Sequence, residues 1–249
     1  MAAVLLGDMR VLLSWSSGKD CAWALHVLRT RGEHEVVGLL TTINTAVARV
    51  SMHAVREEVL DRQAAAVGLP LVKVRIPAVC SNSQYEAAMG AALGQAARSG
   101  IEAVAFGDLF LEEVRRYREQ KLAPTGIAPL FPLWGKPTGD LAYEMVTAGM
   151  QAYVTCVDPR QLDRSFAGRA FNHAFLSDLP ESVDRCGENG EFHSFAFAGP
   201  MFSRPLGVAP GRIVERGGFV YADLLLSGSK AGSARSTGEE ESSAPAQEL

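Results

Sequence analysis

One seven-residue stretch of the chain, SWSSGKD, combines the side chains that an anion-binding loop needs. It supplies hydroxyls, a glycine, an ammonium group and a carboxylate from Ser14, Ser16, Ser17, Gly18, Lys19 and Asp20. The hydroxyls are hydrogen-bond donors, and the glycine lets backbone N–H groups approach a phosphate closely. The lysine adds a positive charge, and a helix that begins here adds the partial positive charge of its N-terminal end. The stretch therefore predicts a phosphate site.

The spacing of this loop excludes two better-known phosphate loops. A Walker loop would have a glycine in place of Leu13 and a hydroxyl residue after Lys19, where this chain has Asp20. A GxGxxG dinucleotide turn is also absent here. Asp20 is then interpretable as a Mg²⁺ ligand beside the phosphates or as a cap of the first helical turn. An ordinary Ser/Gly loop with a surface lysine remains the alternative.

A second polar stretch, CGENGEFH, lies far along the chain and forms a glycine-containing turn. It holds Glu188, Glu191 and His193 close together. Carboxylates attract cations, ammonium among them, and can accept a proton, so we expect this turn to bind or deprotonate ammonia. A zinc site built on Cys186 and His193 would lack further ligands at the usual spacing. A polar turn without chemistry is the alternative.

The elements that position these residues alternate between strand-like and helix-like runs. Strands are predicted at 10–14, 35–42, 71–76, 103–106 and 128–133, and helices at 19–31, 52–67, 82–99 and 111–122. This alternation indicates βαβ units, so we predict an α/β fold with a doubly wound, parallel, five-stranded sheet. The segment 71–76 alternates, with Lys73 and Arg75 on one side, and is predicted at the sheet edge or beside a polar site.

The chain is predicted to have three parts. Residues 1–134 form the nucleotide-binding domain, and residues 135–226 form a smaller α+β domain that binds substrate and ammonia. The second domain is expected to contain a helix that Thr138 caps and that runs to Ala148, a strand at 151–157 and a hairpin around Gly217 and Gly218. Residues 227–249 lack periodic apolar residues and are predicted to be a disordered tail.

The GDLFLEE loop after the fourth predicted strand is expected to face the nucleotide. In a doubly wound sheet this strand lies next to the first, at the crevice where ligands bind. Gly107, Asp108 and Glu112 would approach from the side opposite the SWSSGKD loop, with Asp108 as a Mg²⁺ or ribose partner. The alternative for Asp108 is a cap of the following helix.

Basic residues in RVSMHAVR form a further candidate group, namely Arg49, His53 and Arg56. The last two lie within one turn of each other at a predicted helix start. They are suited to a phosphate or an acidic substrate. Solvated charges at a helix end account for them equally well.

Composition narrows the class of protein. A net charge of −4 argues against broad nucleic-acid binding, which needs a basic face. The four cysteines form no CxxC pair, so no disulfide framework is indicated. No apolar run approaches the length of a membrane helix, and the N-terminus lacks the features of a signal peptide. We therefore predict a cytoplasmic protein with no membrane partner.

Taken together, these stretches resemble one known family. SWSSGKD resembles the SGGKDS loop of the N-type ATP pyrophosphatases, the PP-loop enzymes with an adenine nucleotide alpha hydrolase-like fold. The likeness continues through GLLTT, RVSMHAVR, CSNSQYE, AFGDLFLEEVRRYRE, LFPLW and CGENGEFH. Over roughly residues 10–226 the chain resembles the diphthine-ammonia ligases. Ser17 and Cys21 depart from the glycine and serine of the family loop. A left-handed serine at position 17 would cost about 1 kcal/mol.

The resemblance implies a two-step reaction with ATP and Mg²⁺. A carboxylate is adenylated with release of pyrophosphate, and ammonia then displaces AMP to leave an amide. Catalytic roles are implied for Lys19, Asp20, Glu188, Glu191 and His193, and Mg²⁺ is assigned to Asp20 and Asp108. Nucleotide contacts are implied for Ser14, Ser16, Ser17, Gly18, Lys19, Leu40, Thr41, His53, Gly107 and Asp108, with backbone groups of 39–41 at the adenine.

The expected partners are ATP, ammonium and a carboxylate acceptor. The acceptor is the diphthine of elongation factor 2 if the chain is archaeal or eukaryotic, and otherwise an unknown small molecule or protein. Two other functions stay open, namely a PP-loop enzyme that modifies tRNA and an ATP-binding module without chemistry. The acidic chain disfavours the tRNA alternative. A homo-oligomer is compatible with the sequence.

Overall fold

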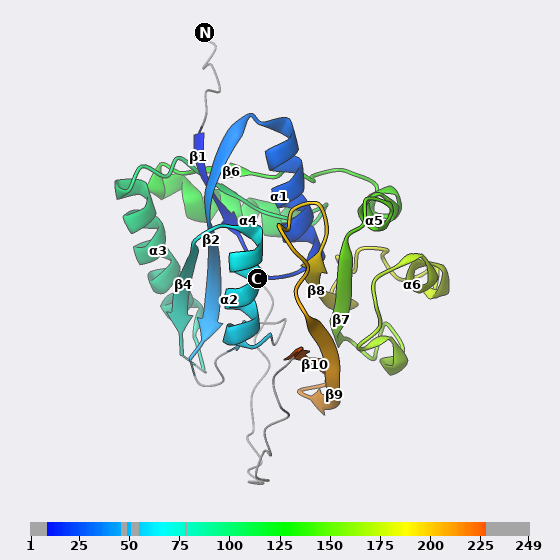
Figure 1. Ribbon diagram of the computed structural model, residues 1–249. Helices are drawn as coiled ribbons and strands as arrows, with labels where there is room; N and C mark the ends of the chain where they lie inside the picture. Colours follow the sequence, from blue (N-terminus) through cyan, green and yellow to red (C-terminus); the bar gives the residue numbers. More distant parts are fainter. Residues whose placement is uncertain (1–8, 46–48, 51–54, 78, 228–249) are drawn as a thin grey trace.

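The computed structural model describes residues 9–45, 49–50, 55–77 and 79–227. Two sheets lie side by side, with helices around them (Figure 1). In chain order the elements are β1 (Met9–Ser14), α1 (Lys19–Arg31), β2 (His34–Asn44), β3 (Arg49–Val50), α2 (Glu57–Val67), β4 (Leu71–Ile76), α3 (Asn82–Arg98), β5 (Ala103–Ala105), α4 (Glu112–Leu122), η1 (Ala123–Thr125), β6 (Ala128–Leu130), α5 (Thr138–Thr147), β7 (Gln151–Val157), η2 (Arg164–Phe166), α6 (His173–Asp178), β8 (Phe192–Ala198), β9 (Val208–Arg216) and β10 (Phe219–Leu226).

The first sheet confirms the predicted doubly wound arrangement. Five strands run parallel in the order β4-β2-β1-β5-β6, and the short β3 adds an antiparallel pair to the end of β2. β1 pairs with β2 on one side and with β5 on the other, so the chain reverses its winding direction at β1. The crevice of such a sheet lies at this switch point, beyond the carboxyl ends of β1 and β5.

Burial explains which strands are central. Val11, Leu13 and Leu39 are fully buried in β1 and β2 because helices cover both faces of the sheet. Among the described strands β4 pairs with β2 alone and lies at the edge, which was one of the two positions that its alternating pattern predicted. Its Lys73 forms ion pairs with Glu57 and with Asp61 of α2.

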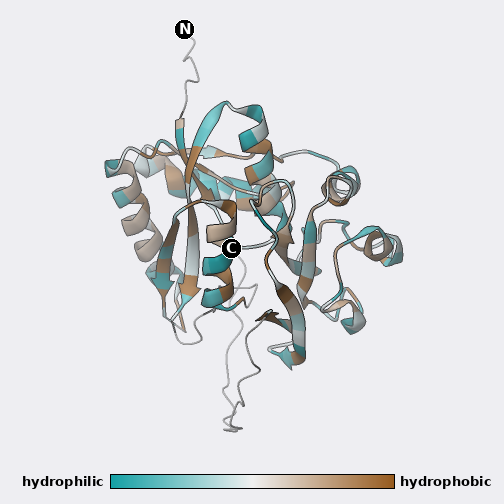
Figure 2. Ribbon diagram, viewed as in Figure 1, coloured by the Kyte–Doolittle hydropathy of each residue, from teal (hydrophilic) through white to brown (hydrophobic). Residues whose placement is uncertain are grey.

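The helices form two layers around this sheet. α1 and α2 pack on one face with a core cluster that includes Val11, Leu13 and Leu39, and α3 packs on the other face against Leu12 and Leu40. Figure 2 shows hydrophobic colours on the strands between these layers and hydrophilic colours on the outer parts of the helices. No helix in the described part of the chain is both long and apolar enough to cross a membrane.

Helix ends are set by local signals, with two corrections. Gly32 closes α1 in the left-handed conformation, and Ser81 caps α3 in a capping box. The second helix was predicted from residue 52, but α2 begins at Glu57, after an extended Arg56. Thr138 was expected to cap α5, but it is the first helical residue and follows the N-cap Pro137.

The second sheet has four antiparallel strands in the order β8-β7-β10-β9. β7 and the hairpin around Gly217 and Gly218 were predicted, whereas β8 and the short α6 were not. Residues 192–198, FHSFAFA, are mostly apolar and follow a glycine-containing turn, so a strand pattern was present there. β8 lies against α1 and thereby brings the CGENGEFH turn toward the first sheet.

The two sheets share one hydrophobic core. The cluster that contains α1 and α2 continues into β7, β8 and β10 through residues such as Val154, Phe195 and Val220. The sequence-based division at residue 135 falls in the loop between β6 and α5. We call residues 135–226 the second unit below. Of the predicted tail, residues 228–249 lie outside the described residues.

Candidate functional site

The loop between β1 and α1 has an unusual backbone at Ser17. Its φ is 73°, and it is the one described residue other than glycine with a positive φ. A left-handed serine costs about 1 kcal/mol, so surrounding contacts must hold it in place. Position 17 is therefore left-handed. The sequence predicted backbone strain at this serine if its conformation were left-handed.

Contacts from three elements hold this loop. Trp15 N donates to Leu40 O of β2 at 2.7 Å, and Ala196 N of β8 donates to Ser17 O at 3.0 Å. Gln63 of α2 donates through Nε2 to Ser17 O at 2.9 Å. Gln63 was not singled out from the sequence. The sequence offered one signal for this residue, because Gln63 is a polar residue within the apolar stretch of an amphipathic helix. In the structure its side chain is completely buried.

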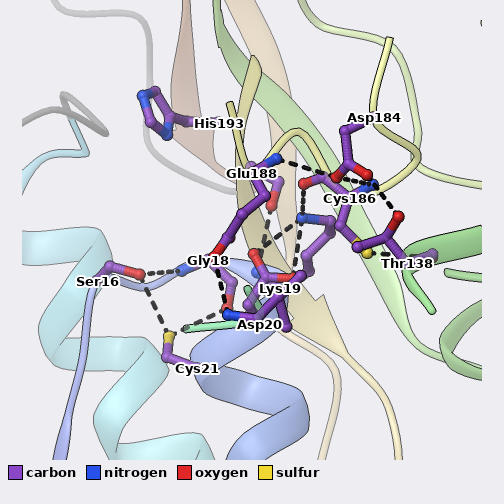
Figure 3. Close-up of polar contacts among 12 residues, drawn as sticks. Ser16, Gly18, Lys19, Asp20, Cys21, Thr138, Asp184, Cys186, Glu188 and His193 are labelled. Atoms are coloured by element: carbon purple, nitrogen blue, oxygen red, sulfur yellow. Dashed lines mark hydrogen bonds and ion pairs between the residues drawn. The ribbon is translucent and has the colours of Figure 1, made fainter. Parts of the chain in front are cut away.

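The hydroxyls of the loop differ in their hydrogen bonds. Ser16 Oγ accepts from Gly18 N and donates to Cys21 Sγ, both at 3.4 Å (Figure 3). Ser17 Oγ is buried and has no hydrogen-bond partner within the described residues. Ser14 ends β1 and is half-buried. Cys21 donates to Gly18 O at 3.1 Å, and burial raises the pKa of its thiol to about 11. The thiol is therefore a hydrogen-bond donor and not a nucleophile at neutral pH.

Lys19 points into the second unit. Its side chain is 2% exposed, and its Nζ lies 2.8 Å from Asp20 Oδ2 and donates to Cys186 O. The rings of Phe171 and Phe192 lie 5.6 and 5.3 Å from Nζ. Burial is the largest single influence on the pKa of Lys19 and acts to lower it. The charge and hydrogen bond of Asp20, together with Cys186 and Glu188, outweigh burial and raise that pKa above its usual value. The lysine therefore stays charged at neutral pH.

Asp20 faces the same cluster and is 27% exposed. Burial raises the pKa of its carboxyl by more than the pairing with Lys19 lowers it. It was expected to cap α1 or to bind a metal. The N-cap of α1 is Gly18, without a side-chain cap, and Asp20 instead pairs with the lysine beside it.

The CGENGEFH turn is held together by two carboxylates. Asp184 Oδ1 accepts from Cys186 N at 2.9 Å and from Glu188 N at 3.1 Å, and Asp184 Oδ2 accepts from the Thr138 hydroxyl. Glu191 is 2% exposed and accepts from the backbone N–H groups of Asp184 and Asn189 at 2.9 and 3.0 Å. Glu191 was predicted to be catalytic, but its oxygens are used within the turn. Asp184 was not predicted.

Glu188 reaches across from this turn to the first sheet. Its Oε1 accepts from Leu109 N, in the loop between β5 and α4, at 2.8 Å. Burial and the charges of Asp20 and Asp108 raise the pKa of Glu188 to about 7, while Leu109 N and Lys19 act in the opposite direction. Glu188 therefore exchanges a proton near neutral pH. Gly187 has a φ of 72°, and a Cβ there would lie 2.7 Å from Phe192 O. The position before Glu188 therefore requires glycine.

The loop between β5 and α4 packs tightly on the start of α1. A Cβ at Gly107 would lie 2.8 Å from Cys21 N and 2.9 Å from Asp20 C, so a larger residue would separate the two. Asp108 binds Arg118 of α4 through both carboxylate oxygens. Its alternative role as a helix cap was wrong, because the N-cap of α4 is Leu111.

Other predicted residues lie away from this cluster. The ring of His193 points away from Lys19 and Glu188 (Figure 3). Arg56 forms an ion pair with Asp223 of β10 and so joins α2 to the second unit. Glu112 is exposed and lies 3.9 Å from Arg116. His53 and the side chain of Arg49 lie outside the described residues.

Leu40 and Thr41 lie where the resemblance placed the adenine, near the carboxyl end of β2. Both are buried, and the carbonyl of Leu40 is used by Trp15 N. The described residues contain no group of three His, Cys, Asp or Glu side chains that is arranged to hold a metal ion. Cys186 Sγ donates to Thr138 O, and burial raises the pKa of its thiol. A zinc site at Cys186 therefore has no support in this geometry.

Comparison with known proteins assigns both halves of the chain to the same protein family. Residues 9–127 match the family model described as the diphthamide synthase N-terminal domain, and residues 137–222 match the diphthamide synthase C-terminal domain. The chain is also similar to the diphthine–ammonia ligase of Bos taurus, with 24% identity over 239 residues, 87% of this chain and 89% of that protein. The human diphthine–ammonia ligase is 23% identical with the same coverage.

Proposed function

Because this chain belongs to the diphthamide synthase family, we propose that it is an ATP-dependent ligase that joins ammonia to a carboxylate. The observation that carries the proposal is the meeting of two loops from distant parts of the chain. The start of α1, with Lys19 and Asp20, lies against Glu188 of the second unit. An anion-binding loop and a proton-accepting carboxylate thus share one site.

The loop is suited to the phosphates of ATP. The N-terminus of a thirteen-residue helix carries partial positive charge, and Gly18 has no side chain to block its backbone N–H. Ser17 adds a buried hydroxyl that has no partner within the described residues. A buried hydroxyl without a partner costs about 1–3 kcal/mol, and a phosphate oxygen would relieve that cost.

Asp20 is the carboxylate that fits Mg²⁺ in this site. Mg²⁺ is commonly held by one or two carboxylates together with phosphate oxygens, and Asp20 is partly exposed beside the loop. When bound, the ion would offset the negative charge that develops on the departing pyrophosphate. Asp108 fits this role less well: it is 14% exposed, against 27% for Asp20, and two nitrogens of Arg118 bind its oxygens, whereas the single Nζ of Lys19 binds those of Asp20.

Two steps account for the reaction. An oxygen of the acceptor carboxylate attacks the α-phosphorus of ATP, and the bond from that phosphorus to the bridging oxygen breaks to release pyrophosphate. The nitrogen of ammonia then attacks the carbonyl carbon of the acyl adenylate, and AMP leaves with the electrons of the carbon–oxygen bond. The proton that the nitrogen loses as the amide forms passes to the phosphate of AMP or to water. Glu188 accepts the proton that ammonium loses to become ammonia, which suits a carboxyl with a pKa of about 7.

Lys19 also links the two parts of the site. Its ammonium group joins Asp20 of α1 to Cys186 of the second unit. The nucleotide loop and the Glu188 turn are thereby held together. In this proposal Lys19 fixes the distance between the nucleotide loop and the Glu188 turn.

The acceptor follows from the family relationship and from the source of the chain. In an archaeal or eukaryotic source we propose the diphthine of elongation factor 2, and in any other source a small molecule or a different protein. The bovine and human relatives are both diphthine–ammonia ligases. Cytoplasmic localisation agrees with this proposal and follows from the same acceptor.

Product analysis tests the proposal. The purified protein is incubated with ATP, Mg²⁺ and ¹⁵N-ammonium, with either diphthine-bearing elongation factor 2 or a metabolite extract as acceptor. We expect AMP and pyrophosphate in equal amounts, together with an acceptor that has gained one ¹⁵N amide by mass spectrometry. Turnover that requires tRNA would replace this function with tRNA modification. ATP binding without AMP formation under any of these conditions would leave a nucleotide-binding module.

The matched variants are Glu188→Gln and Glu112→Gln. Glu188→Gln removes the proposed base and is expected to slow amide formation by about 10²-fold or more. Glu112 is exposed, and its replacement should leave turnover unchanged. Equal activity in both variants would contradict the role of Glu188.

A further inference from the structure

Gln63 is a completely buried amide that joins three separate elements. Its Oε1 accepts from the indole Nε1 of Trp15 at 2.8 Å. Its Nε2 donates to Ser17 O at 2.9 Å and to Ala196 O of β8 at 2.6 Å. Both donors of the amide are therefore used, and they bind carbonyls that come from opposite sides of the site.

These contacts fix the direction of one peptide group. Ser17 O receives two donors, Gln63 Nε2 at 2.9 Å and Ala196 N at 3.0 Å. In a planar trans peptide the C=O and the following N–H point in opposite directions. With Ser17 O directed toward α2 and β8, the N–H of Gly18 must point the other way, and it does reach Ser16 Oγ at 3.4 Å.

We infer that Gln63 is a positioning residue that aims the Gly18 N–H at the phosphates and ties the nucleotide loop to β8. The inference rests on the proposed function, because it assigns a phosphate to the loop. It goes beyond that function by assigning a role to a residue of α2. Ser17 is left-handed at an energetic cost, so a contact that holds its carbonyl decides whether the loop keeps this shape without nucleotide.

The link to β8 explains why one amide serves both halves of the site. Ala196 offers both its N–H and its carbonyl to this junction. Two residues earlier on the same strand, Ser194 Oγ accepts from Lys19 N at 3.2 Å. The strand that follows the Glu188 turn is thus bonded to the loop on both sides of Gly18.

The experiment compares Gln63→Met, Gln63→Glu and the control Trp15→Phe. Methionine has a similar shape without the amide, so it loses both bonds to the carbonyls. Trp15→Phe removes the indole donor and disturbs the same core, but it leaves both amide N–H groups on Ser17 O and Ala196 O. The control therefore separates loss of stability from loss of loop position. Should Gln63→Met fail to fold, Gln63→Asn provides a shorter amide that cannot reach both carbonyls.

Two measurements are made on the full-length chain. Hydrogen exchange of peptides covering 14–22 is measured without nucleotide, and affinity for α,β-methylene-ATP with Mg²⁺ is measured by calorimetry. We expect faster exchange in Gln63→Met and an affinity reduced by about 10-fold or more, since the bonds to Ser17 O and Ala196 O are lost together with the one from Trp15. Trp15→Phe should stay within about 3-fold of the wild-type affinity.

The Gln63→Glu variant adds a pH readout. An ionised glutamate would face two carbonyl oxygens without a donor, whereas its protonated form regains one hydrogen bond. We expect its affinity for the ATP analogue to rise as pH falls from 8 to 6, relative to the wild type over the same range. If Gln63 serves packing alone, the pH dependence should appear in the free energy of unfolding and not in the affinity of the folded protein.

The outcomes keep the inference and the proposed function distinguishable. If the wild-type protein does not bind the ATP analogue, the proposed function is wrong. Hydrogen exchange of residues 14–22 would still test whether Gln63 holds the loop in place. Unchanged exchange at 14–22 in Gln63→Met would overturn the positioning role whatever the affinity. Equal losses in Gln63→Met and Trp15→Phe would also overturn it, because general destabilisation would then explain both.

Discussion

Glu188 Oε1 and Leu109 N are joined by a 2.8 Å hydrogen bond that connects the second unit to the loop after β5. This bond holds a carboxyl with a pKa of about 7 beside Asp20 and Lys19, at the crevice of a doubly wound sheet. A carboxyl of this kind, in a closed polar cluster, is typical of functional sites. The predictions below examine the residues that build this cluster.

Glu188→Gln should remove the acid limb of the pH–rate profile. A carboxylate acts as a base only when it is ionised. Wild-type turnover should therefore increase with pH around 7, the pKa of Glu188, and should be low at pH values below that pKa. The amide of the substituted side chain cannot ionise, so the variant should have a flat profile over this range and a rate lower by about 10²-fold or more. The measurement is kcat from pH 5.5 to 8.5 with ATP, acceptor and ammonium at saturating concentrations. A limb that persists in the variant would assign the titration to another group.

Ser17→Gly should stabilise the protein without nucleotide. Glycine accepts the φ of 73° without strain, and the change also removes a buried hydroxyl that has no partner among the described residues. The expected gain is about 1 kcal/mol in the free energy of unfolding, measured by urea denaturation. Ser17→Ala keeps the strain but removes the hydroxyl, so the pair separates the two contributions. A less stable Ser17→Gly protein would show that the serine side chain supports the loop.

Gly107→Ala should force the β5–α4 loop away from α1. The new Cβ would lie 2.8 Å from Cys21 N, where backbone atoms cannot yield, and the cost should be about 1–3 kcal/mol together with a loss of turnover. The control is Gly139→Ala in α5, where nothing lies within 4 Å of the added Cβ. That change should instead be neutral or stabilising by up to about 1 kcal/mol. Thermal denaturation and AMP release are measured for both.

Lys19→Ala should abolish turnover and also weaken the fold. The substitution leaves Asp20 in a largely buried cluster without its cation, for which the expected cost is about 3 kcal/mol or more. Adding Asp20→Asn removes the stranded charge, so the double variant should recover much of the stability but none of the turnover. Chemical denaturation and AMP release are compared for the two proteins. Turnover that survives in Lys19→Ala would contradict its place in the site.

Much of the fold was predictable from the sequence. The bounds of α1, β4 and β7 were predicted to the residue, and the parallel, doubly wound sheet with its fourth predicted strand beside the first was predicted from the alternation of strands and helices. The two polar loops were also identified from residue types and spacing, before any contact was known. These features are local, because periodicity, turn residues and helix ends act over a few neighbouring residues.

Tertiary structure decided how the two loops use their side chains. Lys19 turns to Cys186, Glu191 serves its own turn, and Gln63 and Asp184 hold backbone groups that no local pattern marked. The bonds from Lys19 to Cys186 and from Gln63 to Ala196 span 167 and 133 residues of the chain. Such pairings form only after β8 packs against α1. The physical reason is that a buried polar group takes whichever partner the packing brings within reach, and the sequence alone determines only that it will need one.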